Sequence, residues 1–174
     1  MSEYLLKLEN ITKTFPGTVA LAGVDFDLNP GEIHALIGEN GAGKSTLIKI
    51  ICGIHKPDTG RIYLNGKPVT IPNPQVAQQY GIAAIYQEPT VFPDLNVVEN
   101  VFMGHQEYSE LTRRIKWRKM YDDAGLLLKS LGVDLNPRAK VKSLSVAEQQ
   151  LVEIMKALST KSRILIMDEP TSAL

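Results

Sequence analysis

Apolar and polar residues alternate near the start of the chain in the way that half-buried strands require. In the segment 19–28, Val24, Phe26 and Leu28 alternate with acidic and amide residues, which is a period of two. The segment 4–11 is likewise expected to be a strand. The first part of the chain therefore predicts β-structure.

Further strands are indicated by short apolar runs and by one turn. Asn65-Gly66 separates the segments 61–64 and 67–71, and this dipeptide favours a tight hairpin because both of its residues adopt positive φ readily. Short apolar runs, each typical of a buried strand, lie at 33–37, 82–86 and 164–167.

The remaining pattern predicts helices. Asn73-Pro74 resembles an N-cap followed by proline, and Asn96 with Glu99 resembles a capping box. One long helical face is formed by Trp117, Met120, Tyr121, Ala124, Leu127, Leu128 and Leu131. Helices are expected at 44–53, 74–81, 117–131 and 145–158. Strands that alternate with helices indicate an α/β fold with a parallel sheet, into which residues 88–141 insert a helical segment.

Composition narrows the class of protein. The 174 residues suffice for one domain, and 19 Lys and Arg balance 19 Asp and Glu, which argues against nucleic-acid binding. The single cysteine, Cys52, fits a reducing compartment. The sequence has no apolar run of about 18 residues, and charges interrupt residues 1–10, unlike a secretory signal. We therefore expect a cytosolic protein that reaches a membrane only through a partner.

A glycine-rich run follows the expected strand 33–37 and fits the pattern G-x-x-x-x-G-K-S: Gly38, Glu39, Asn40, Gly41, Ala42, Gly43, Lys44 and Ser45, with Thr46 next. Glycines let backbone N–H groups surround phosphate oxygens, and the following helix directs its positive end at the same anion. Lys44 can reach the β- and γ-phosphates, and the Ser45 hydroxyl can ligate Mg²⁺. The alternative is an ordinary glycine-rich turn with a solvated lysine.

Two acidic residues, Asp168 and Glu169, follow the apolar run 164–167. In a P-loop enzyme the end of such a strand emerges beside the nucleotide. Asp168 would then hold Mg²⁺ through water, and Glu169 would position or deprotonate the attacking water. A buried strand followed by an acidic turn is the alternative.

The order of these motifs resembles the nucleotide-binding subunit of ABC transporters over the whole chain. Gly38–Thr46 resembles the Walker A loop, and Ile164–Glu169 resembles the Walker B strand. Gln87 is similar to the Q-loop glutamine, which in the family reaches Mg²⁺ and the attacking water. Phe15 lies where the family places an aromatic ring that stacks on adenine, although it could also be an ordinary core residue.

Residues 144–148 lie where the family has its LSGGQ signature. Val146 and Ala147 replace two glycines, and Glu148 replaces the glutamine. The resemblance implies that Ser145 and its helix N-terminus bind the γ-phosphate of an ATP held by a second copy. Ser145 with Glu148 is also a plain capping box, and both interpretations can hold together.

The amino-acid sequences of residues 86–89, 97–104 and 144–154 are similar to those of monosaccharide importers of the ribose, galactose and xylose type. The resemblance implies an ATPase motor with ATP and Mg²⁺ as cofactors, located peripherally on the cytoplasmic face of the cell membrane. Its partners would be a second cassette paired head to tail, transmembrane permease subunits and, indirectly, a periplasmic or extracellular sugar-binding protein, with no nucleic acid. The alternatives are a nucleotide-binding fragment without turnover, an ABC-type ATPase outside transport and a small-molecule kinase.

The family resemblance also implies how the chain is divided into subdomains. It implies a partial ATP-binding domain of the P-loop NTPase fold, with an antiparallel β-subdomain and Walker A core at 1–87, a helical subdomain at 88–141, and the signature helix and Walker B strand at 142–174. It further implies that the sequence stops before the family's switch histidine, because His34, His55 and His105 all precede Walker B. The strand expected between the Walker A and Walker B strands would then be missing, which would leave sheet backbone unpaired.

Overall fold

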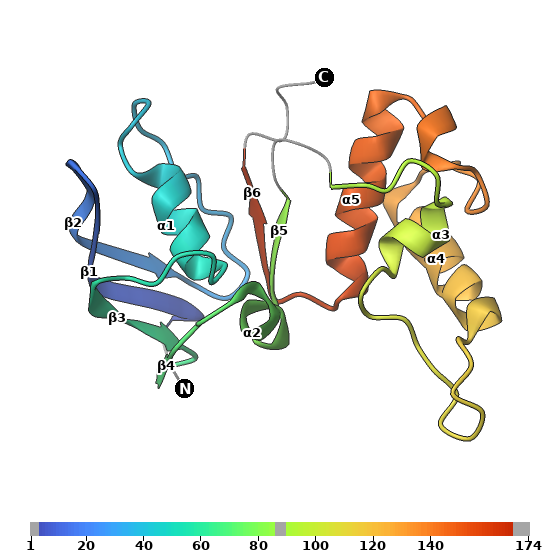
Figure 1. The fold of residues 1–174 in the computed structure, drawn as a ribbon, viewed down its shortest axis with the longest axis horizontal. Helices are drawn as coiled ribbons and strands as arrows, with labels where there is room; N and C mark the ends of the chain where they lie inside the picture. Colours follow the sequence, from blue (N-terminus) through green and yellow to red (C-terminus); the bar gives the residue numbers. More distant parts are fainter. Residues whose placement is uncertain (1–3, 86–89, 169–174) are drawn as a thin grey trace. The chain divides into compact units, whose positions relative to one another are not determined.

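The computed structural model describes residues 4–85 and 90–168, and its chain divides into two compact units, residues 1–80 and 81–174. Figure 1 shows the elements of each unit along the chain. Among the described residues, no helix combines the length and the apolar character that a membrane crossing needs.

The first unit is built on a four-stranded antiparallel sheet in the order β2-β1-β3-β4. Its strands are β1 (Leu6–Phe15), β2 (Thr18–Leu28), β3 (Thr59–Leu64) and β4 (Lys67–Val69). The central strand β1 contributes Leu6, Leu8 and Ile11 to the core, where each is fully buried. The helices of this unit are α1 (Lys44–Ile51) and α2 (Pro74–Gln79).

The hairpin predicted at Asn65-Gly66 is confirmed. Leu64 pairs with Lys67 across the turn, and Asn65 and Gly66 have φ angles of 49° and 74°. Two successive positive φ angles give the turn a twist that matches the flanking strands.

The prediction of a buried strand at 33–37 is wrong. This segment has no regular secondary structure, and Ile33 and Ile37 are 99% and 89% exposed. An apolar run becomes a strand only where a neighbour supplies a hydrogen-bonded ladder. Among the described residues, none pairs with this run.

The second unit contains a two-stranded parallel sheet and a helical part. Strand β5 (Ile82–Ile85) pairs with β6 (Ile164–Met167) in the register Ile82↔Ile164 to Ile85↔Met167, so the parallel pairing predicted from the alternation of strands and helices is confirmed. The helices are α3 (Val97–Val101), α4 (Trp117–Leu131), the short 3₁₀ helix η1 (Val141–Ser143) and α5 (Val146–Ser159).

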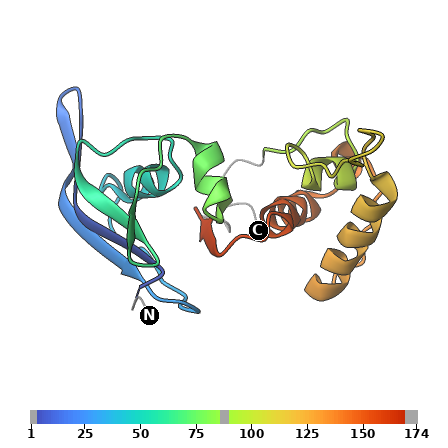
Figure 2. The ribbon, with the colours of Figure 1, turned by 90° about the horizontal axis from the view of Figure 1, so that it is seen from below.

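Helices α3, α4 and α5 pack together around one apolar core, as Figures 1 and 2 show. The fully buried members of that core are Val97, Val98, Val101, Met120, Ala124, Val141, Val152 and Met155. Each helix turns its apolar stripe toward the others, as helical periodicity requires. The core therefore holds α5 and the segment before α3 in one body.

Candidate functional site

The glycine-rich loop leads into α1 through two residues of positive φ. Gly41 has φ 86°, and Gly43, the N-cap of α1, has φ 88°. A Cβ on Gly43 would lie 2.4 Å from Ala20 O and 2.8 Å from Leu21 Cδ2, whereas a Cβ on Gly41 would meet nothing within 4 Å. Gly43 is therefore required by both conformation and packing, and Gly41 by conformation alone.

The N-terminus of α1 has no cap of its own. No side chain caps it, and its first turn contains no acidic residue. Helix α4 shares both properties, whereas Asn73, Asn96 and Ser145 cap α2, α3 and α5. Within the described residues, no acceptor bonds the amides of Lys44, Ser45 or Thr46. These N–H groups carry the positive end of the helix dipole, so the loop fits an anionic phosphate group.

Lys44 lies folded against the loop. Its Nζ donates hydrogen bonds to Gly38 O at 2.6 Å and to Glu39 O at 2.9 Å. The ammonium group is thus held beside the glycine-rich loop, and this loop leads directly into the amides at the start of α1. A cation at the positive end of a helix is unfavourable for the helix itself, so this position suits anion binding better than it suits stability.

Phe15, the residue predicted to stack on adenine, ends β1. Its ring is half-buried and meets the His55 ring edge-on, with 5.2 Å between centroids. Lys13 Nζ lies 5.6 Å from the centroid of the same ring. The ring is thus not enclosed in the core, and its adenine role stays a prediction.

The capping box predicted at Ser145 forms in full. Ser145 Oγ accepts from Glu148 N at 3.3 Å, and Ser145 N and Oγ each donate to Glu148 Oε2 at 2.8 Å. These two donations, the backbone one foremost, hold the pKa of the Glu148 carboxyl below its usual value. The start of α5 is therefore occupied by its own side chains, and the phosphate contact of Ser145 stays a prediction.

The Walker B residues are only partly described. Asp168 follows β6, and its N–H donates to Ile85 O at 2.9 Å, which extends the pairing of β5 and β6 by one bond. Glu169 and Gln87 lie outside the described residues. Ser45 and Asp168 belong to different units, so their joint Mg²⁺ site stays a prediction.

Sequence reasoning missed a buried carboxylate. Glu153 of α5 is only 7% exposed, and it accepts hydrogen bonds from Thr90, which lies 63 residues earlier. The one sequence signal is an acidic residue within the apolar run 151–155. That signal marks an unusual residue but does not identify its partner.

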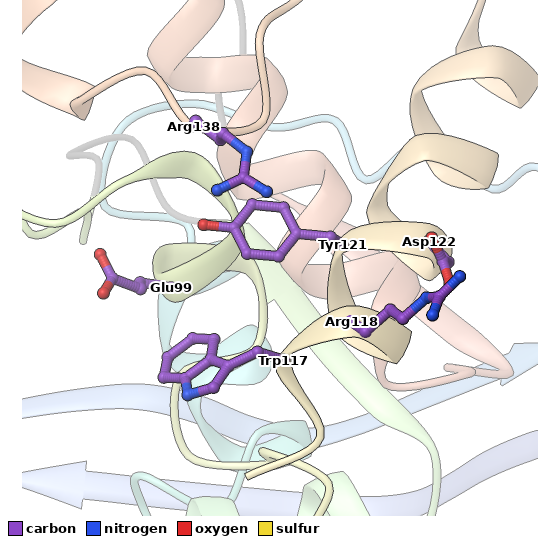
Figure 3. Close-up of a pocket in the computed structure, with 6 residues that line it drawn as sticks. All are labelled: Glu99, Trp117, Arg118, Tyr121, Asp122 and Arg138. Atoms are coloured by element: carbon purple, nitrogen blue, oxygen red, sulfur yellow. The ribbon is translucent and has the colours of Figure 1, made fainter.

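Sequence reasoning also missed a cavity of about 570 Å³ in the second unit. Figure 3 shows the guanidinium of Arg138 over the ring of Tyr121, with 4.4 Å from its central carbon to the ring centroid. The cavity is lined by Glu99, Trp117, Arg118, Tyr121, Asp122 and Arg138. Aromatic rings and both signs of charge therefore meet in one hollow.

Nearly the whole chain is similar in sequence to part of curated proteins. The ribose import ATP-binding protein RbsA 1 of Streptomyces avermitilis is 53% identical over 99% of this chain and 33% of its own length. The xylose import ATP-binding protein XylG of Geobacillus kaustophilus is 48% identical over 100% of this chain and 34% of its own length. The chain thus spans about a third of the length of these relatives.

Solved structures share the fold. A nucleotide-free ATP-binding cassette from an ABC transporter aligns with a TM-score of 0.83 and 35% identity, over 98% of this chain and 71% of its own. The ADP conformation of MJ1267, another cassette of an ABC transporter, aligns with a TM-score of 0.82 and 32% identity, over 98% of this chain and 70% of its own. The sequence profile of the ABC transporter family matches residues 21–172. The chain therefore belongs to the ABC transporter family and has the P-loop NTPase fold of its ATP-binding cassettes.

Proposed function

We propose that this chain binds ATP with Mg²⁺ and hydrolyses it, as the motor of a transporter that imports a monosaccharide. The observation that supports nucleotide binding most directly is the uncapped N-terminus of α1 behind a loop of the P-loop pattern, with Lys44 held beside it. The sugar class rests on relatives named for ribose and xylose import.

The residues of the loop have distinct tasks in this proposal. The amides from Glu39 to Thr46 surround the phosphates, and Lys44 supplies positive charge to their oxygens. The Ser45 hydroxyl and the Asp168 carboxylate would hold Mg²⁺. Bound Mg²⁺ would neutralise charge that develops on the transferred phosphoryl group. Phe15 provides a stacking face for adenine.

Hydrolysis would depend on the Walker B and signature residues. Glu169 would orient or deprotonate the attacking water, and Gln87 would help to hold the same water and Mg²⁺. Ser145 acts on the nucleotide of a second cassette that is paired head to tail with the first. Because backbone and side-chain dipoles are fixed before reaction, such a site lowers the barrier mainly by electrostatic stabilisation.

The proposed partners are those that the motor of an importer requires. They are a second ATP-binding cassette, transmembrane permease subunits and an external sugar-binding protein that acts through the permease. The chain would lie on the cytoplasmic face of the membrane. Its balanced charge of 19 basic and 19 acidic residues supports a protein partner over nucleic acid.

The nucleotide chemistry is tested by titrating MgATP and measuring phosphate release on the same protein. Glu169→Gln should keep ATP affinity within about twofold and abolish turnover, because only the water-activating group is changed. Glu110→Gln, at an exposed position of the second unit, is the matched control. Binding without turnover in the parent protein would favour the non-catalytic alternative, and turnover by Glu169→Gln would remove that residue from its role.

Transport is tested in membrane vesicles that contain the assembled transporter. Uptake of labelled ribose, xylose and galactose should require ATP on the cytoplasmic side and should cease with Glu169→Gln. ATP hydrolysis that is indifferent to all three sugars and to the permease would instead favour an ABC-type ATPase outside sugar transport.

A further inference from the structure

The ring of Phe15 is contacted by two side chains from different parts of the first unit. The His55 ring meets it edge-on, with 5.2 Å between the centroids and 69° between the ring planes. The ammonium group of Lys13 lies 5.6 Å from the centroid of the same ring. Edge-on packing of aromatic rings and a cation near a ring are both favourable, so these contacts restrict the orientation of the half-buried Phe15 ring.

The end of β1 that carries Phe15 is itself fastened by Asp58. Lys13 Nζ donates to Asp58 Oδ1 at 2.7 Å, and Thr14 N donates to Asp58 Oδ2 at 2.7 Å. The Lys13 side chain is only 17% exposed, which is low for a lysine. The backbone that leads into Phe15 and the ammonium group beside its ring are therefore both held by one carboxylate.

Helix α1 brings His55 to the ring. The amides of Ile54 and His55 both donate to Lys49 O, at 2.8 Å and 3.1 Å, in the last turn of the helix. The N-terminus of the same helix follows the glycine-rich loop, and its eight residues rise about 12 Å. One rigid element therefore links the loop that is proposed to hold phosphates to the residue that packs on Phe15.

Strand β2 connects Phe15 to the same loop by a second route. Thr18 of β2 pairs with Phe15, and two residues later Ala20 O lies where a Cβ on Gly43 would be only 2.4 Å away. Pairing and strand rise together place the backbone of Phe15 at most about 13 Å from that of Ala20. An extended nucleoside triphosphate can span this distance, with its phosphates at the loop and its base at the ring.

We propose that His55 is a positioning residue for the adenine base, which it serves by holding the Phe15 ring in the orientation that stacks on adenine. This inference rests on the proposed function, in which Phe15 contacts the base and the loop contacts the phosphates. A ring that is already ordered loses little freedom when the base binds. The effect of His55 is therefore on recognition of the base and not on recognition of the phosphates.

The binding test uses the full chain and two probes, MgATP and magnesium tripolyphosphate, which carries phosphates without ribose or base. His55→Ala should weaken MgATP binding about five- to tenfold and change tripolyphosphate binding less than about twofold. His55→Phe keeps an aromatic ring and should bring MgATP affinity back to within about twofold of the parent protein. In a Phe15→Ala background, His55→Ala should weaken MgATP binding further by less than about twofold, because the two residues act together.

A matched control removes a similar contact elsewhere in the first unit. The His34 ring meets the Phe26 ring edge-on, with 4.9 Å between centroids, so His34→Ala deletes a comparable pair of rings. This variant should leave the affinity for both probes unchanged. An equal loss of MgATP binding in His34→Ala would show that His55→Ala acts through general destabilisation and would overturn the proposal.

The remaining outcomes separate this inference from the proposed function. Weaker MgATP binding in Phe15→Ala but not in His55→Ala would overturn the role of His55 alone. Equal losses for MgATP and tripolyphosphate in His55→Ala, or no recovery in His55→Phe, would do the same. A parent protein that binds neither probe would count against the proposed function, and the inference would fail with it.

Discussion

Helices α1 and α5 both begin at residues for which the sequence predicts phosphate contact, yet they begin in different ways. Behind Gly43, α1 has neither a side-chain cap nor an acidic first turn. At Ser145, α5 has a complete capping box that places Glu148 at its own N-terminus. The amides of α1 are therefore available to a ligand, whereas in α5 the capping box already satisfies the N–H groups of Ser145 and Glu148.

The charges at the two helix starts strengthen this contrast. Glu148 places a negative charge at the positive end of α5, which stabilises that helix. Lys44 places a positive charge at the positive end of α1, where its Nζ donates hydrogen bonds to the carbonyls of Gly38 and Glu39. One helix start is arranged for stability and the other for an anion. Phosphate contact at α5 must therefore reach the Ser145 end despite the carboxylate of Glu148.

The largest expected effect is on the loop before α1. Gly43→Ala should lower the free energy of unfolding by about 3 to 5 kcal/mol, because a positive φ and a collision with Ala20 O act together. Gly41→Ala is the matched control, because it has a similar φ but open space around its Cβ, and it should lose only about 1 kcal/mol. Urea unfolding measures both. Equal losses would show that the contact with Ala20 does not matter.

Lys44→Met should weaken ATP binding about 100-fold, a loss of about 2.7 kcal/mol, because a charge-assisted contact to phosphate is removed. Stability should not fall, since the change also relieves an unfavourable charge at the helix start. Lys49→Met, at an exposed position of the same helix, serves as the control. Affinity follows from MgATP titration, and stability from urea unfolding. A loss of stability without a loss of affinity would make Lys44 a structural residue.

Ser145→Ala should destabilise the protein by about 1 kcal/mol, because the N-cap of α5 loses its side-chain acceptor. Ser145→Thr should recover most of that loss, since threonine also caps helices. If Ser145 serves only as a cap, ATP turnover should recover in parallel with stability in the threonine variant. Turnover that remains low while stability recovers would support the predicted phosphate contact.

Local sequence signals predicted local structure well. The hairpin at Asn65-Gly66 and the caps at Asn73, Asn96 and Ser145 depend on neighbours within three residues, and all are present. The glycine-rich loop and its helix also depend on a short stretch of chain. Such features are fixed by φ preferences and by hydrogen bonds that span one turn.

Features that depend on distant parts of the chain were less predictable. The run 33–37 has the composition of a buried strand, but a strand also needs a ladder partner, which composition does not supply. Glu153 and Thr90 are 63 residues apart, so only the folded arrangement pairs them. The same holds for Arg138 over Tyr121. The roles of Gln87 and Glu169, which lie outside the described residues, rest on the sequence alone.

The smallest expected effect is at Glu148, where a lower pH removes the charge of the side chain without changing its shape. The hydrogen bonds from Ser145, the backbone one first, lower the pKa of Glu148 from the usual 4.5. A lowered pKa means that the ionised carboxylate stabilises the folded state, fully above the unfolded pKa and progressively less as pH falls through the folded pKa. Glu148→Gln should therefore be slightly less stable than the parent protein at about pH 7, by less than Ser145→Ala, and the difference should shrink below about pH 4.5.

Thermal unfolding of the two proteins from about pH 7 to about pH 3 measures this difference, and Glu110→Gln controls for the loss of a negative charge at an exposed site. A difference that grows on acidification would mean that Glu148 does not stabilise the helix start as a carboxylate. The same variant sharpens the contrast between α1 and α5. Removing the carboxylate should strengthen the effect of MgATP on α5, seen as greater protection of its first turn from hydrogen exchange, because the helix end then attracts an anion without opposition. Protection at α1 should stay as it is in the parent protein, since no acidic residue occupies its first turn.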